Sequence, residues 1–149
     1  MIDGLADDPR AGALLKMGAI HLGRGSTFLN TFDFGSRLEG VAAIHGRTVL
    51  RVAVMPLAGR QTRIQPSADG MFSTVDFRSE LVAGLLTASG IDEDAVAESG
   101  WSLVPLAPIA LQLEQDGLDA LTREQRFFLL GYDALITTRG GREATALAR

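Results

Sequence analysis

The hydrophobic positions of the chain follow two periods, and the changes between them predict where helices and strands lie. From Pro9 to about Leu22, apolar side chains recur at helical spacing, with Asp8 placed as an N-cap and Pro9 at the first helical position. Gly23 and Gly25 follow this stretch and end the predicted helix. The chain is therefore expected to begin with a helix.

Alternation of apolar and polar residues then predicts strands over residues 28–34 and 41–55. In the longer stretch, Gly46 either divides it into two short strands or marks a bulge. Residues 60–65 and 71–75 alternate again on either side of a Pro-Ser-Ala-Asp-Gly sequence that is typical of turns. Together these segments predict an antiparallel meander.

Helical periodicity returns after the meander. Asp76 or Ser79 can cap a helix that runs to about Ser89, where Gly90 ends it. The acidic run at 92–94 is typical of a helix N-terminus and predicts a short helix there.

Residues 101–113 are mostly apolar, but Pro105 and Pro108 interrupt them. Proline removes a backbone donor and is confined to edge positions in sheets, so this segment is expected to be an edge strand or a buried loop and not a regular helix.

The segment Thr122–Gln125 matches the capping-box pattern and predicts the start of a helix. Apolar residues in its body, which extends to Ile136, cover more than the single stripe that a surface helix buries. Either the helix is central to the fold or it pairs with another chain. The side chains expected at such an interface are Phe127, Phe128, Tyr132 and Leu135.

These elements predict one α+β domain over residues 1–149. Its expected architecture is an N-terminal helix, an antiparallel sheet of about four or five strands, and a helical C-terminal half packed on one face.

Composition narrows the class of protein. The chain has 149 residues, 46% of them hydrophobic, and a formal net charge of -4. It has no cysteine, which excludes disulfides, thiolate metal sites and cysteine nucleophiles. Its first residues lack the features of a secretory signal and no apolar run is long enough for a membrane span, so a cytoplasmic protein without membrane contact is expected.

Charge is distributed unevenly along the chain. Residues 37–78 contain six arginines and three acidic side chains, whereas residues 79–149 contain five arginines and eleven acidic side chains. Such asymmetry indicates a surface that attracts anions, an attraction between the halves within the fold or across a dimer, or two solvated surfaces. The acidic pI of about 5.1 and the absence of interleaved aromatic and basic residues argue against nucleic acid.

One cluster of candidate ligand-binding residues remains. If the predicted strands pair, several guanidinium groups converge on one sheet face and can hold a carboxylate or phosphate in bidentate fashion. The cluster consists of His45, Arg47, Arg51 and Arg63. A solvated sheet face explains the same residues.

Other motifs are weaker. The Gly23–Thr27 loop resembles a phosphate-binding loop, but it lacks the third glycine of a dinucleotide fingerprint and the lysine of a P-loop, and follows a predicted helix. His21 has no predicted carboxylate neighbour. The acids at 92–94 do not have the spacing of a calcium loop, so no metal and no cofactor are expected.

The absence of a catalytic signature favours a non-enzymatic binding or assembly module that acts as a homo-oligomer or with a protein partner. The alternative is a small enzyme or ligand-binding domain in which the arginine-bearing sheet face holds an anionic small molecule and His45 supplies acid–base catalysis. The sequence leaves open whether there is any catalysis.

Overall fold

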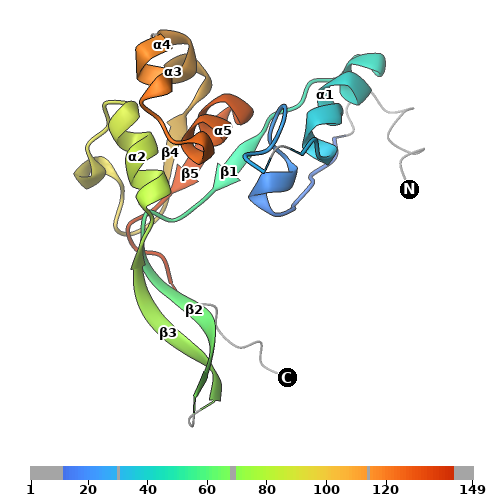
Figure 1. The fold of residues 1–149 in the computed structure, drawn as a ribbon. Coiled ribbons are helices and arrows are strands. Elements are labelled where there is room, and N and C mark those ends of the chain that lie inside the picture. The colour runs from blue at the N-terminus through green and yellow to red at the C-terminus, as the bar shows by residue number, and fades with distance from the viewer. Residues whose placement is uncertain (1–11, 30, 68–69, 114, 143–149) are drawn as a thin grey trace.

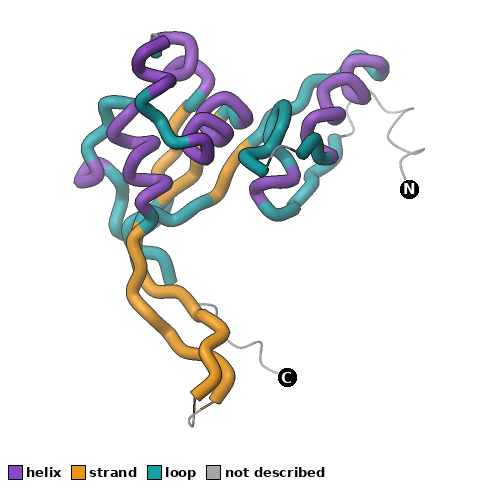
Figure 2. Tube along the Cα trace, viewed as in Figure 1, coloured by secondary structure: helices purple, strands orange, loops and turns teal. Residues whose placement is uncertain are grey.

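A computed structural model of the chain describes residues 12–29, 31–67, 70–113 and 115–142. Within these ranges the chain combines helices and strands, in agreement with the predicted α+β class. The strands form two separate sheets, of three and two strands (Figure 2), and not the single antiparallel sheet of four or five strands that the sequence predicts.

The larger sheet has the strand order β1–β5–β4. β1 (Val52–Val54) runs parallel to the central strand β5 (Ala134–Thr137), and β4 (Ser102–Pro105) runs antiparallel to β5. The parallel pair joins segments from opposite halves of the chain, which a tight turn cannot do. This long-range pairing is the reason why a simple meander does not form.

The second sheet is a hairpin formed by β2 (Ala58–Ser67) and β3 (Gly70–Arg78). It confirms the predicted strands at 60–65 and 71–75 and their antiparallel pairing. In Figure 1 the hairpin extends away from the other elements.

The base of the hairpin is fixed to the C-terminal segment. The Arg60 amide donates to the Gly141 carbonyl at 2.8 Å, and the Gly141 amide donates to the Ala58 carbonyl at 3.0 Å. A Cβ at Gly59 would lie 2.2 Å from the Gly141 carbonyl oxygen, and the φ of +132° at Gly59 also disfavours any other residue. The hairpin therefore leaves the fold at a defined position.

α2 (Glu80–Ala88) confirms the helix predicted after the hairpin. Ser79 caps it, because its hydroxyl accepts a hydrogen bond from the Val82 amide at 3.3 Å. A 3₁₀ turn, η3 (Glu93–Ala95), follows at the position of the predicted short helix, with Asp92 as its cap.

α5 (Arg123–Gly131) begins where the capping box predicts. The Gln125 amide donates to the Thr122 hydroxyl at 3.1 Å, and the Gln125 side chain accepts from the Thr122 amide at 2.9 Å. The predicted extension of this helix to Ile136 is wrong, because β5 occupies that segment. A short apolar run fits a buried strand as well as a helix, and pairing with two neighbouring strands determines the outcome here.

The proline-containing segment is both strand and helix. β4 is an edge strand, as predicted, and Pro105 is its last residue. The expectation that no regular helix forms here is wrong, since α3 (Ala107–Gln112) follows directly. Pro108 lies in the first turn of α3, where a helix has no backbone hydrogen bond for the missing amide to make. α4 (Gln115–Asp119) comes next.

The elements predicted for the N-terminal part of the chain agree less well with the structure than those predicted after residue 55. The start of the predicted helix at residues 9–22 lies outside the described residues, and its described part contains only a 3₁₀ turn, η2 (Ala19–His21). A single bridge between Ser26 and Phe32 stands where a strand was expected at 28–34.

α1 (Phe34–Ile44) overlaps the first part of the strand predicted at 41–55. The Asp33 side chain caps this helix by accepting from the Phe34 amide at 2.6 Å, and this cap competes with the extended conformation. Only β1 confirms the later part of that prediction.

The hydrophobic core lies where α2 and α5 pack against the three-stranded sheet (Figure 1). α2 and α5 approach closely at Gly84, where a Cβ would collide with the Gln125 side chain. The fully enclosed apolar side chains come from α2, α5, β5 and the adjoining loops, and include Leu57, Val82, Leu85, Leu86, Leu106, Leu129 and Leu135.

Candidate functional site

The structure does not bring together the four residues of the predicted ligand-binding cluster. His45 directly follows α1, and Arg47 donates its backbone amide to the Ala42 carbonyl in the same turn. Arg51 precedes β1, whereas Arg63 lies in β2. Because Figure 1 places α1 and the hairpin on different sides of the fold, these four side chains do not form one sheet face.

Arg51 is buried, with 3% of its surface exposed, and it binds the chain itself. Its Nε donates to the Leu22 carbonyl and its Nη2 to the Gly35 carbonyl, each at 3.0 Å. Nη1 lies 3.1 Å from Glu39 Oε1. The guanidinium group therefore holds the N-terminal segment and α1 against the start of β1.

Arg24 extends this arrangement to the loop before β5. It donates to Glu39 Oε1 at 3.0 Å and to Asp133 Oδ1 at 2.5 Å, while Asp133 Oδ2 accepts from the Arg51 amide at 2.7 Å. We call Arg24, Glu39, Arg51 and Asp133 the arginine latch. Its alternating charges join the N-terminal segment, α1, the start of β1 and the loop before β5.

The carboxylates of the latch are held in their ionised form. Burial by itself raises the pKa of Asp133, but the hydrogen bonds from Arg24 and from the Arg51 amide outweigh it and leave that pKa below its usual value. The hydrogen bond from Arg24 likewise lowers the pKa of Glu39. The latch is thus a structural ion-pair network, and its two arginines are already bound to groups of the chain itself.

The four residues expected at a protein interface lie in the core. Phe127, Phe128, Tyr132 and Leu135 have at most 7% of their surface exposed. The rings of Phe128 and Tyr132 stack with centroids 5.5 Å apart, and the Tyr132 hydroxyl donates to the Ala19 carbonyl. Burial raises the pKa of Tyr132 to about 12. Because the chain itself encloses Phe127 and Phe128, these two match the alternative prediction of a helix central to the fold, whereas Tyr132 follows α5 and Leu135 lies in β5.

The largest apolar side chains on the hairpin, in contrast, are exposed. Ile64 and Phe72 are paired across the two strands and point to the same face, with 73% and 68% of their surface exposed. Met71, on the opposite face, is 58% exposed. We call Ile64, Met71 and Phe72 the hairpin patch.

The outer edge of β3 lies beside this patch. β3 pairs with β2 along one edge, and no other strand of the described residues pairs with it. From Gly70 to Val75 it contains neither a charged residue nor a proline. Alternation in the sequence predicted this hairpin, but it gave no signal that the hairpin stands apart from the sheet.

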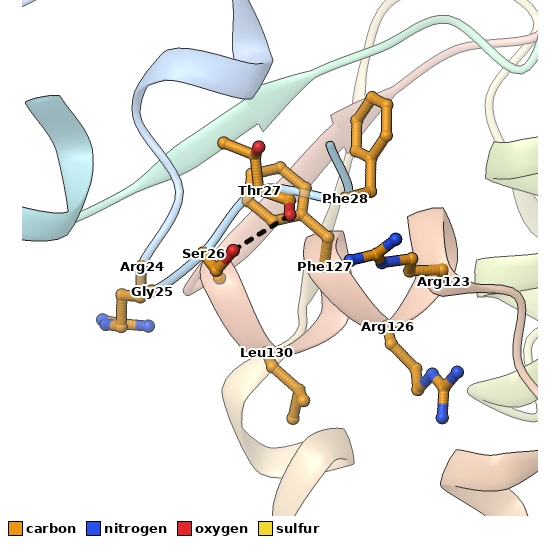
Figure 3. A pocket seen from close by; sticks show the side chains of 10 residues that line it. Arg24, Gly25, Ser26, Thr27, Phe28, Arg123, Arg126, Phe127 and Leu130 are labelled. Atoms are coloured by element: carbon orange, nitrogen blue, oxygen red, sulfur yellow. Dashed lines mark hydrogen bonds between the residues drawn. The ribbon is translucent and has the colours of Figure 1, made fainter. Parts of the chain in front are cut away.

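A cavity of about 560 Å³ lies between residues 24–28 and α5 (Figure 3). Its loop side is formed by the segment that resembles a phosphate-binding loop, and its helix side contains Arg123 and Arg126. The sequence singled out the loop but could not place these two arginines beside it.

His21 has a carboxylate neighbour that the sequence did not reveal. Its Nδ1 lies 2.5 Å from Asp33 Oδ2, and both side chains are partly exposed. The Phe34 amide and then His21 lower the pKa of Asp33. This pair lies outside the cavity, next to the N-terminus of α1.

In the part of the chain that the structure describes, no three His, Asp or Glu side chains gather to form a possible metal site. None of the described helices has the length and apolar character needed to span a membrane. Comparisons with protein-family models, with curated proteins and with solved structures find no match for this chain.

Proposed function

We propose that the chain is a non-enzymatic assembly module that self-associates through the β2–β3 hairpin. The observation that carries this proposal is an isolated two-stranded hairpin with exposed apolar side chains, the hairpin patch. A two-stranded ribbon is only marginally stable in water, and three or more strands or a packed face are needed for independent stability. A second hairpin would supply the missing strands.

The edge of β3 favours pairing with another strand. Natural proteins protect exposed sheet edges with charges, prolines or bulges. β2 has such protection, because it contains Arg60, Arg63 and Pro66 and its register is irregular between Ile64 and Ser67. β3 has none between residues 70 and 75, so β3 is the proposed contact edge.

A second copy of the chain fits this edge by symmetry. Two β3 strands that pair antiparallel about Ser73 or Thr74 place Asp76 opposite Gly70 or Phe72 of the other copy, so that like charges do not meet. The same registers bring the Phe72 side chains of both copies to one face of a four-stranded sheet. A two-fold interface of this kind is the commonest arrangement in homo-oligomers.

The alternative function, a small enzyme or ligand-binding domain with an arginine-bearing sheet face, requires the guanidinium groups of Arg47, Arg51 and Arg63 to converge. Arg51 is instead buried in the arginine latch, and Arg63 lies on the hairpin. The geometry therefore favours the assembly module.

The test is the mass of the protein in solution, measured by sedimentation equilibrium over a range of concentrations. We expect the full chain to reach twice its 15.8 kDa as the concentration rises. Phe72→Glu adds a charge to the proposed interface and should return the protein to a monomer. Because Phe72 is 68% exposed, this variant should keep the circular dichroism spectrum of the wild type.

Leu111→Glu is the matched control, since Leu111 is 89% exposed on α3 and the substitution also replaces an exposed apolar side chain by glutamate, away from the hairpin. It should leave the dimer intact. A wild-type protein that stays monomeric at every concentration, or equal dispersal by both variants, would contradict the proposal.

A further inference from the structure

The cavity beside α5 combines an apolar wall with a cationic rim. One face of α5 lines it through four residues spaced as i, i+3, i+4 and i+7, which are Arg123, Arg126, Phe127 and Leu130. Residues 24–28 form the opposite side. A volume of about 560 Å³ is within the range of small-molecule sites, which are about 300–1,000 Å³.

The apolar wall is preformed. The rings of Phe28 and Phe127 meet edge to face, with centroids 5.7 Å apart. Gly23 lets the chain pass directly over the Phe127 ring, because a Cβ at that position would lie 2.4 Å from the ring. Leu130 adds an apolar side chain that is half exposed at the cavity. An apolar ligand group would therefore find a wall that needs little rearrangement.

The cationic rim is formed by Arg123 and Arg126 at the start of α5. Arg123 makes no hydrogen bond or ion pair with the residues that the structure describes, and Figure 3 shows its guanidinium group turned toward Phe127. Among the described residues, Arg126 has one weak ion pair, in which its Nη1 lies 3.5 Å from Asp119 Oδ1 and both side chains are exposed. Arg24, by contrast, belongs to the arginine latch, and its side chain points away from the other labelled residues in Figure 3.

The loop adds hydrogen-bond donors to this rim. The backbone amides of Gly25 and Ser26 donate to no acceptor among the described residues. Gly25 has a φ of +71°, and a backbone of this kind can direct successive amides toward one anion. The Ser26 hydroxyl donates to the Thr27 carbonyl at 3.3 Å and can still accept a hydrogen bond.

We infer that this cavity binds a small organic anion in which an apolar, preferably aromatic, body is joined to an oxyanion head group. The body packs mainly on Phe28 and Leu130, because Phe127 has only 7% of its surface exposed, and the head group accepts hydrogen bonds from Arg123 and the Gly25–Ser26 amides. A bare inorganic anion lacks the apolar contact, and an uncharged aromatic molecule lacks the partner for Arg123. The inference is independent of the hairpin and of self-association.

The probe is 8-anilinonaphthalene-1-sulfonate, which has both parts of the expected ligand. It is titrated into the ¹⁵N-labelled full chain while amide chemical shifts are followed by NMR, in parallel with inorganic phosphate and with the uncharged N-phenyl-1-naphthylamine. We expect saturable shifts at Gly25, Ser26 and Leu130, and weaker binding of the other two probes. The variant Arg123→Gln should weaken binding of the sulfonate about tenfold or more, as expected for the loss of a charged hydrogen bond.

Arg63→Gln is the matched control, because it removes the same charge from the exposed face of β2. It should leave the affinity unchanged. The inference is overturned if the sulfonate does not bind, if its shifts map to the hairpin patch, if the uncharged probe binds as tightly, or if both variants weaken binding equally. An unchanged amide spectrum away from the cavity verifies that Arg123→Gln is folded.

Discussion

Removing the Arg51 guanidinium group should detach the N-terminal segment from the rest of the fold. Arg51→Met keeps the length of the side chain and its apolar stem but removes both donors to the Leu22 and Gly35 carbonyls. It also removes the charge that faces Glu39 at 3.1 Å. The substitution therefore leaves two carbonyl oxygens without their donors in a place where Arg51 is 3% exposed.

The magnitude follows from these contacts. A hydrogen bond to a charged group contributes about 1.5–3 kcal/mol, so the two bonds to the Leu22 and Gly35 carbonyls together contribute about 3–6 kcal/mol. The ion pair with Glu39 adds little, because the Glu39 side chain is 54% exposed and keeps its hydrogen bond from Arg24. We expect the free energy of unfolding to fall by about 3–5 kcal/mol, which corresponds to a urea midpoint lower by about 2 M for a typical slope of about 2 kcal/mol per M.

The assay is urea unfolding followed with two signals. Circular dichroism reports on α1 together with the other helices, and fluorescence reports on Trp101, the residue that precedes β4. In Arg51→Met the helical signal should begin to fall at a lower urea concentration than in the wild type. The control Arg63→Met, on the exposed hairpin strand, should change stability by less than about 0.5 kcal/mol. A loss below about 1 kcal/mol in Arg51→Met would refute the reasoning, because it would mean that the latch is not needed.

Two further predictions concern the same contact. Gly35→Ala should destabilise the protein by about 3 kcal/mol in the same assay, because a Cβ at Gly35 would lie 2.3 Å from the Leu22 carbonyl carbon; Gly40→Ala, where a Cβ meets nothing within 4 Å, should not. The latch should also weaken in acid. The pKa values of Glu39 and Asp133 are lowered in the folded state, so their contribution is complete above the ordinary carboxyl pKa of about 4 and is lost as the pH falls through the lower folded values. Urea midpoints that are equal at pH 7 and pH 3 would contradict this expectation.

Local signals predicted the elements in which neighbouring residues decide the structure. Ser79 and the capping box at Thr122 mark helix starts through hydrogen bonds that span only three residues. The hairpin was predictable for a similar reason, since the Pro-Ser-Ala-Asp-Gly sequence between its two strands is typical of turns. In each case the competing conformations lack that hydrogen bond or turn.

Long-range contacts account for the elements that were predicted incorrectly. Ala134–Thr137 has an apolar pattern that fits a helix, but parallel pairing with β1 and antiparallel pairing with β4 make it a strand. Residues 41–44 alternate as a strand would, yet they continue a helix that Asp33 starts and Arg51 holds in place. The pattern of a short stretch of sequence does not include these partners, because they are distant along the chain.

In the candidate sites, too, the sequence predicted local features but not long-range contacts. The sequence identified the arginine content of residues 37–78 but not that Arg51 is enclosed by carbonyl groups, which turns an expected ligand contact into a structural one. It identified the apolar character of residues 127–136, but not that this segment divides into the helix α5 and the strand β5; the alternative of a central helix accounts only for Phe127 and Phe128. The sequence indicated only the loop side of the cavity, because Arg123 is brought next to the Gly23–Thr27 loop by tertiary packing.

The central claim is that the edge of β3 is completed by a second copy of the chain. Hydrogen–deuterium exchange of the β3 amides, measured by NMR at low and at high protein concentration, tests it most directly. The account predicts that the outward-facing amides among residues 71–75, which do not donate to β2, become more protected as the concentration rises, while protection within α2 and β5 changes much less. Protection of residues 71–75 that does not depend on concentration would contradict it.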